Sequence, residues 1–204
     1  MPRPRSFAPG DAVRAARDHF WRYGYEATSL SDLEAATQLN RSSLYQAFGT
    51  KRRLFDLALE SYLAEVAWPR LAPVEKEGAG AKAVAAYFTA LAAAFETAPP
   101  EVASRGCLIV NTITELGAHD AEARAFGAAY RERIARAFAA AFASETRPRA
   151  AETPARAAER PARAAKRRAD LATAALIGVL VTARLDPRAA ASIARATAAE
   201  LKHF

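Results

Sequence analysis

The sequence is poor in the residues that form disulfides, metal sites and catalytic centres. Its one cysteine is Cys107, so no internal disulfide can form, which fits a reducing compartment. The three histidines are scattered, and no nucleophile arrangement, paired carboxylates or metal-ligand spacing accompanies them. A glycine-rich phosphate loop is also missing. We therefore expect a protein that is not an enzyme and that holds no metal or other cofactor.

Long apolar runs are absent as well. No stretch of about 18 apolar residues occurs, so no transmembrane helix is expected. The N-terminal segment MPRPRSFAPG lacks the apolar centre of a signal peptide and is typical of a short, flexible basic arm. These features predict a cytoplasmic protein that has no membrane partner.

Alanine, by contrast, is abundant and supplies more than a quarter of the 204 residues. It is the best helix former, and proline and glycine stand mostly between the periodic segments. Because 51% of the residues are hydrophobic, the chain can bury the core of one or two domains. This composition predicts an all-α protein.

Positive charge is concentrated in two blocks of the chain, whose net charge is +7. Residues 1–53 contain nine Lys/Arg and five Asp/Glu, and residues 140–168 contain eight and three. The basic charge of the first block suits phosphate binding. The second includes 146–165, which has three prolines and no large apolar residue. We predict a flexible, solvated linker there in preference to a second phosphate-binding segment.

Capping signals predict the first two helices. Asp11 can cap a helix that ends near Tyr23, where Gly24 follows. Ser29 followed by Asp32 is typical of a capping box and predicts a helix over 30–37.

Two more caps follow at once. Asn40 predicts the start of a short helix over 41–48, and Thr50 predicts the start of a longer helix. The turn 38–40 therefore joins two short helices, which is the pattern of a helix-turn-helix.

The remaining helices are expected beyond residue 80. Periodic apolar residues predict them over about 82–97, 105–118, 121–143, 166–185 and 187–202. The helix over 166–185 is apolar around much of its circumference, so it needs partners. We expect the last two helices to form a four-helix bundle with a second subunit across a two-fold axis.

The first 55 residues resemble the DNA-binding domain of the TetR/AcrR family of transcriptional regulators. The resemblance rests on A-x3-F-x3-GYEATSLSDLEAAT and LNRSSLYQAFGTKRRLF, and covers about 15–55. Later segments, GCLIVNTITELGAHD and LIGVLVTARLDP, are similar to the regulatory domain of one subset of the family.

The resemblance implies two domains. The first is an N-terminal three-helix helix-turn-helix DNA-binding domain over 1–50. The second is a C-terminal helical ligand-binding and dimerisation domain over 51–204, with the linker at about 146–165. The family usually has glycine where this chain has Gln38, and a left-handed glutamine there costs about 1 kcal/mol relative to glycine.

The helix over 41–48 has the character of a recognition helix for the major groove. Gln46 can form two hydrogen bonds with adenine, and Arg41 can reach guanine or a phosphate. The Tyr45 hydroxyl suits a phosphate, and Lys51 resembles the family's phosphate-binding lysine. The predicted DNA-binding residues are Thr28, Ser29, Arg41, Ser42, Ser43, Tyr45, Gln46 and Lys51.

By the same resemblance, the C-terminal domain holds a pocket for an unknown small-molecule effector. Asn111 and Thr114 are the most telling candidates, because polar groups on a buried helix need partners. Each candidate fits a purely structural core position equally well, so both interpretations stay open. The predicted ligand-binding residues are Phe88, Leu91, Phe95, Cys107, Val110, Asn111, Thr114, Phe126 and Tyr130.

The combined prediction is a homodimeric DNA-binding transcriptional regulator, a repressor that a small molecule releases from a palindromic double-stranded operator. One alternative keeps this scaffold and makes Cys107 a sensor of oxidants or electrophiles, which requires an accessible thiol of lowered pKa. A more distant alternative is a ligand-binding protein that has lost DNA binding. The presence of Tyr45 and Lys51 argues against it.

Overall fold

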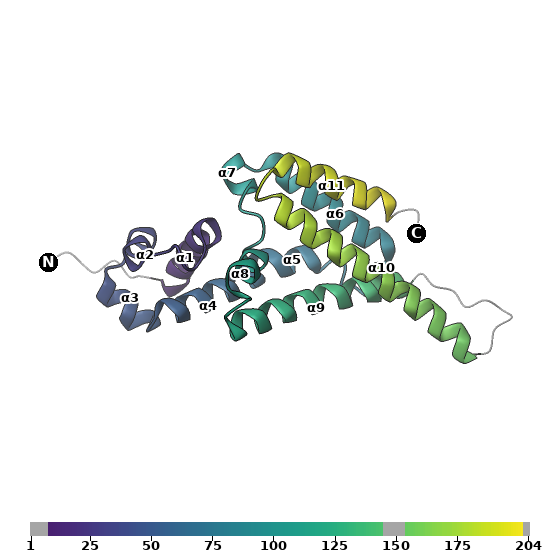
Figure 1. Ribbon diagram of the computed structural model, residues 1–204, viewed down its shortest axis with the longest axis horizontal. Helices are drawn as coiled ribbons and strands as arrows, with labels where there is room; N and C mark the ends of the chain where they lie inside the picture. Colours follow the sequence, from purple (N-terminus) through teal and green to yellow (C-terminus); the bar gives the residue numbers. More distant parts are fainter. Residues whose placement is uncertain (1–7, 145–153, 202–204) are drawn as a thin grey trace. The chain divides into compact units, whose positions relative to one another are not determined.

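A computed structural model describes residues 8–144 and 154–201, with side chains from residue 162 onward in the second range (Figure 1). These residues form helices and no strands, which confirms the all-α prediction. None of the helices in this part of the chain is long and apolar enough to cross a membrane. The chain divides into two compact units, one ending at Trp68 and the other beginning at Pro69.

The first unit is a small helical domain with an aromatic core. Helix α1 packs against α2 and α4, and α3 packs against both α2 and α4. Phe20 and Phe55 are buried, with ring centroids 5.0 Å apart in a T-shaped arrangement. Leu33, also buried, brings α2 onto this core. The elements are α1 (Pro9–Tyr23), α2 (Leu30–Thr37), α3 (Arg41–Phe48), α4 (Lys51–Tyr62) and a π-helical segment (Leu63–Ala67).

The predicted caps of α2 and α3 are confirmed. Ser29 Oγ accepts a hydrogen bond from the Asp32 amide at 3.1 Å, and Asp32 Oδ2 accepts one from the Ser29 amide at 2.7 Å. The Asn40 side chain accepts one from the Ser43 amide at 2.8 Å. Helix α1 differs, because it begins at Pro9 and places Asp11 inside the first turn instead of at the cap.

Gln38 ends α2 in the left-handed conformation, with φ 59° and ψ 26°. No other non-glycine residue in the described ranges has a positive φ. Its side-chain Nε2 donates a hydrogen bond to the Ala35 carbonyl at 2.7 Å. The turn is therefore strained at Gln38, and the exposed hydrogen bond offsets part of the free-energy cost of that strain.

Replacing Gln38 by glycine is expected to raise the free energy of unfolding by about 1 kcal/mol, because glycine adopts this conformation without a Cβ clash. Gln38→Ala is the matched control, since it loses the same hydrogen bond and keeps the Cβ. Urea denaturation of both variants measures the difference. A glycine variant no more stable than the alanine variant would show that the turn is unstrained.

A buried arginine extends the first unit beyond α4. Arg17 is 9% exposed and donates hydrogen bonds to Ser61 Oγ at 3.2 Å and Glu65 Oε2 at 2.7 Å. The bond from Arg17 is the main cause that lowers the pKa of Glu65. Because these contacts hold the π-helical segment onto α1, the unit boundary lies later than the division at 50/51 drawn from the sequence.

The second unit is a helical bundle. Helix α11 packs along α6 and α10, α10 packs along α9, and α9 also contacts α6 and α8 (Figure 1). Phe88 and Phe138 are buried in its core with ring centroids 6.1 Å apart. The remaining helices of the chain are α5 (Trp68–Leu71), α6 (Gly80–Thr97), α7 (Pro100–Ala103), α8 (Leu108–Leu116), α9 (Ala121–Ala143), α10 (Pro154–Thr182) and α11 (Pro187–Glu200).

The prediction of a flexible linker over 146–165 is wrong for its second part, which belongs to helix α10. The helix begins at Pro154 and continues through Pro161, so 154–165 are helical, while 146–153 lie outside the described residues. A proline in the first turn loses no helical hydrogen bond. Pro161 does lose one, but the alanine, arginine and glutamate around it have high helix propensity and continue the helix.

Candidate nucleic-acid interface

Helix α3 presents its polar side chains to solvent and its apolar ones to the core. Leu44 and Phe48 are 5% and 8% exposed and pack toward α2 and α4. Both sit where a helical period of three to four residues brings them onto one face. The residues outside this face that are exposed or half-buried include Arg41, Ser42, Ser43, Tyr45 and Gln46.

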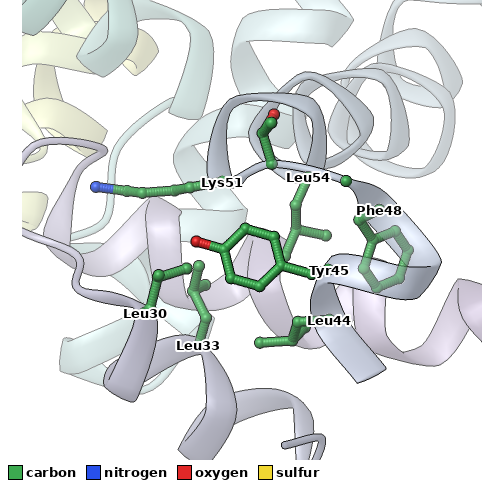
Figure 2. Close-up of a pocket in the computed structure, with 9 residues that line it drawn as sticks. Leu30, Leu33, Leu44, Tyr45, Phe48, Lys51 and Leu54 are labelled. Atoms are coloured by element: carbon green, nitrogen blue, oxygen red, sulfur yellow. The ribbon is translucent and has the colours of Figure 1, made fainter. Parts of the chain in front are cut away.

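Tyr45 lies over a hollow between α2, α3 and α4. Its side chain is 44% exposed, and the Arg41 guanidinium carbon lies 5.9 Å from its ring centroid. Figure 2 shows the Tyr45 hydroxyl and the Lys51 ammonium extending in the same direction. The hollow is lined by Leu30, Leu33, Leu44, Tyr45, Phe48, Gly49, Thr50, Lys51 and Leu54.

Lys51 is positioned by the aromatic core of the first unit. Its Nζ lies 4.3 Å from the centroid of the Tyr25 ring, a cation–π distance. The Tyr25 ring in turn lies 4.7 Å from Phe55 and 6.1 Å from Phe20, centroid to centroid. The ammonium group therefore rests on a ring that packs against the buried core, which limits the positions that it can adopt.

The N-terminus of α2 adds partial positive charge beside this group. The first amides of a helix lack intrahelical acceptors, and they favour an anion. Hydrogen bonds from Ser29 lower the pKa of Asp32, and the charges of His19 and Lys51 act in the same direction. Lys51 is thus close enough to the start of α2 for its charge to act there.

Thr28 is placed differently from the other predicted DNA-binding residues. Its side chain is 1% exposed, and its hydroxyl donates a hydrogen bond to the Gly24 carbonyl at 2.6 Å. That hydroxyl holds the loop between α1 and α2. Ser29, the next residue, is exposed and caps α2.

Seven of the eight predicted residues are therefore exposed or half-buried: five lie on α3, Ser29 caps α2, and Lys51 begins α4. The amide of Gln46 and the guanidinium of Arg41 are groups that can hydrogen-bond to base edges. The Tyr45 hydroxyl, the Lys51 ammonium and the first amides of α2 are donors that suit phosphate oxygens. The phosphate donors lie at the starts of α2 and α4 and on Tyr45, and the base-recognising side chains lie on α3. The site can therefore bind the backbone of a nucleic acid and form hydrogen bonds with its bases.

The nine predicted ligand-binding residues fall into two sets in the second unit. Val110, Thr114 and Tyr130 line a cavity of about 320 Å³ between α8, α9 and α10. The other six are absent from its lining: Phe88, Leu91, Phe95, Cys107, Asn111 and Phe126. Thr173 and Gly127 also line it, although neither was among the predicted residues. In the sequence, the small apolar residues around Thr173 are typical of a closely packed helix, and nothing in this pattern indicates a cavity.

Cys107 and Asn111 hold the start of α8 in place. Cys107 is 0% exposed, and its Sγ lies 3.6 Å from the Tyr130 hydroxyl. Asn111 Nδ2 donates a hydrogen bond to the Arg105 carbonyl at 2.9 Å. An oxidant dissolved in water has no direct access to this sulfur.

Among the described residues, no three His, Cys, Asp or Glu side chains gather in a way that could hold a metal ion.

Comparison with known proteins adds evidence of relationship. Residues 12–58 match the family of bacterial regulatory proteins called tetR family. The chain is 36% identical over 115 residues to the HTH-type transcriptional repressor ComR of Escherichia coli (strain K12), covering 56% of this chain and 53% of ComR. It is 35% identical over 122 residues to the HTH-type transcriptional regulator YezE of Bacillus subtilis (strain 168), covering 60% and 61%. The match thus spans only about half to three fifths of these relatives.

A solved structure resembles the chain over nearly its whole length. A cysteine-substituted form of the TetR family transcriptional regulator CifR, in complex with 26-bp double-strand operator DNA, has a TM-score of 0.70 and 27% identity. The similarity covers 97% of this chain and 98% of CifR. Both units therefore have counterparts in one known regulator.

Proposed function

Since the chain belongs to the TetR family of bacterial regulatory proteins, we propose that it is a homodimeric transcriptional repressor that binds a palindromic operator and is released by a small molecule. In this proposal, α3 enters the major groove. The groups at the start of α2 and α4 hold the flanking phosphates.

The observation that carries the proposal is the exposed polar face of α3 on a rigid aromatic scaffold. Arg41, Ser42 and Gln46 are exposed on a helix whose other face is fixed by buried Leu44 and Phe48. A short helix with this division suits the major groove, which admits one helix. CifR, with 27% identity and similarity across both units, is known in complex with operator DNA.

The same proposal covers two further points: the protein represses transcription, and a small molecule ends the repression. ComR is a transcriptional repressor, and we propose repression for this chain as well. The cavity between α8, α9 and α10 is a candidate effector site in the second unit. Effector binding weakens operator binding if the effector prefers the conformation that does not fit DNA.

The alternative trigger, oxidation of Cys107, has less support. The sulfur is fully buried beside the Tyr130 hydroxyl, whereas a reactive thiol needs access to its oxidant. We therefore place the small-molecule trigger first.

The first test addresses base recognition by Gln46. DNA that the wild-type protein selects from a random pool supplies the operator. Gln46→Ala is expected to lose about tenfold in discrimination at one adenine of each half-site, because a glutamine–adenine pair contributes about 1–3 kcal/mol. Fluorescence anisotropy with single-base variants of the operator measures this loss.

Gln38→Ala provides the matched control, since it removes an exposed glutamine from the turn and leaves α3 intact. It should keep the base preference of the wild type. If Gln46→Ala selects the same sequence with the same discrimination as the wild type, α3 does not read DNA through this residue.

A further inference from the structure

The cavity in the second unit is almost entirely apolar. It has a volume of about 320 Å³, at the lower end of the range of roughly 300–1,000 Å³ for small-molecule sites. Walls of this kind bind a ligand mainly by burying its apolar surface. The lining residues come from α8, α9 and α10, and the apolar ones among them include Val110, Ile113, Ile134, Leu176, Ile177 and Leu180.

Thr173 differs from the other lining residues, because its buried hydroxyl has no partner among the described residues. The residue is 1% exposed, and no hydrogen bond to Thr173 Oγ1 is formed within the described part of the chain. Buried hydroxyls in proteins are nearly always paired, and an unpaired one costs free energy. A ligand that supplies the missing partner would recover that cost.

Other threonines in the helices show that the missing bond is not imposed by helical geometry. Thr112 donates to the Leu108 carbonyl at 2.9 Å, and Thr182, on the same helix as Thr173, donates to the Gly178 carbonyl at 2.8 Å. This bond to the carbonyl four residues back is the usual partner of a helical threonine. Thr173 does not use it, although the residue lines the cavity, and its hydroxyl can change position by rotation about the Cα–Cβ bond.

Charge at the cavity restricts the ligand further. Its lining contains two arginines, Arg124 and Arg131, both exposed, and no carboxylate. Arg124 donates a hydrogen bond to the Gly117 carbonyl at 2.7 Å, which holds its guanidinium near the end of α8. A cationic ligand would meet like charge there, whereas a neutral or anionic one would not.

We propose that this cavity binds a mainly apolar small molecule, neutral or anionic, that carries one hydrogen-bonding oxygen, and that Thr173 determines specificity by pairing with that oxygen. The inference rests on the proposed regulation by a small molecule. It is tested without DNA, so that its failure and the failure of operator release are distinguishable.

The experiment uses two probes of the same size, 2-naphthol and 2-methylnaphthalene, which differ by a hydroxyl in place of a methyl group. Isothermal titration calorimetry gives the Kd of each for the full-length wild type and for Thr173→Val. The valine side chain has nearly the shape of threonine and lacks the hydroxyl. The ratio of the two Kd values is expected to shift about tenfold toward 2-methylnaphthalene in Thr173→Val, since one hydrogen bond contributes about 1.4 kcal/mol, a factor of ten.

Two further variants separate specificity from folding. Thr173→Ser keeps the hydroxyl and should keep the wild-type ratio. Thr182→Val makes the same change on the same helix outside the cavity lining, and it should also leave the ratio unchanged. An unchanged ratio in Thr173→Val, or no binding of either probe to the wild type, would overturn the proposal.

The operator experiment remains independent of this result. A probe that binds with the expected Thr173 dependence but leaves DNA affinity unchanged would support the ligand class and contradict release by occupation of this cavity. A protein that binds its operator but neither probe would overturn the ligand class alone.

Discussion

Replacing Val181 and Ile193 together by aspartate is expected to yield a folded monomer that binds operator DNA at least about a hundredfold more weakly than the wild type. Both side chains are large, apolar and exposed, at 41% and 43%, and Val181 lies at the edge where the surface meets the cavity that it also lines. Leu171 and Leu185 extend the same kind of surface along α10 and its end, at 64% and 86%. Helices α10 and α11 pack against each other, and large exposed apolar side chains on such neighbouring helices are what we expect at an interface.

The surface is also suited to close helix packing. Gly178 lies on α10 between Leu171 and the end of the helix, and a Cβ added there would meet no atom within 4 Å. A small residue at such a point lets the backbones of two helices approach. The double variant would place four carboxylates in the buried centre of a symmetric interface, which is costly because they lack partners.

Sedimentation velocity measures the mass of the variant, and circular dichroism checks that it is folded. Ala86→Asp, which adds a charge at an exposed position of α6, should remain dimeric. A double variant that stays dimeric would place the interface elsewhere and remove the basis for a two-fold operator.

Gly106→Ala is expected to lower the free energy of unfolding of the second unit by about 3 kcal/mol. Gly106 has φ 64°, a conformation that costs a residue with a Cβ about 1–2 kcal/mol. In addition, a Cβ there would lie 2.7 Å from the Leu180 carbonyl oxygen and 3.2 Å from Arg184 Cγ. Because the nearest atom belongs to the backbone of α10, the helix itself would have to move.

Gly78→Ala separates these two effects. Gly78 also has a positive φ, 71°, but a Cβ there meets no atom within 4 Å. It should lose only the conformational part, about 1 kcal/mol. Urea denaturation followed by circular dichroism compares the two. If both variants lost the same free energy of unfolding, α10 would have to move away from the added Cβ of residue 106 at little cost.

The first unit could be predicted closely from the sequence because its signals are local. Ser29 with Asp32 and Asn40 with the following amides define helix starts over three or four residues, and the structure confirms both. Gln38 was identified as an exception to the family pattern, and it is left-handed in the structure. The helix-turn-helix follows from these positions.

The second unit could be predicted less well because its features depend on contacts between distant residues. Pro154 and Pro161 predicted a break, but α10 begins at Pro154 and the surrounding residues continue it through Pro161. Gly106 delays the start of α8 to Leu108, because it must approach the backbone of α10. The missing partner of Thr173 is visible only once α8, α9 and α10 are packed together.

The dependence of operator affinity on salt in Lys51→Ala tests the central claim most directly. If Lys51 of each protomer neutralises one phosphate, the slope of log Kd against log salt concentration should be smaller by about two than in the wild type. Arg136→Ala removes a cation from the exposed surface of α9, where the side chain is 72% exposed, and should leave the slope unchanged. A slope in Lys51→Ala equal to that of the wild type would contradict the proposal that α3 and the start of α4 hold DNA together.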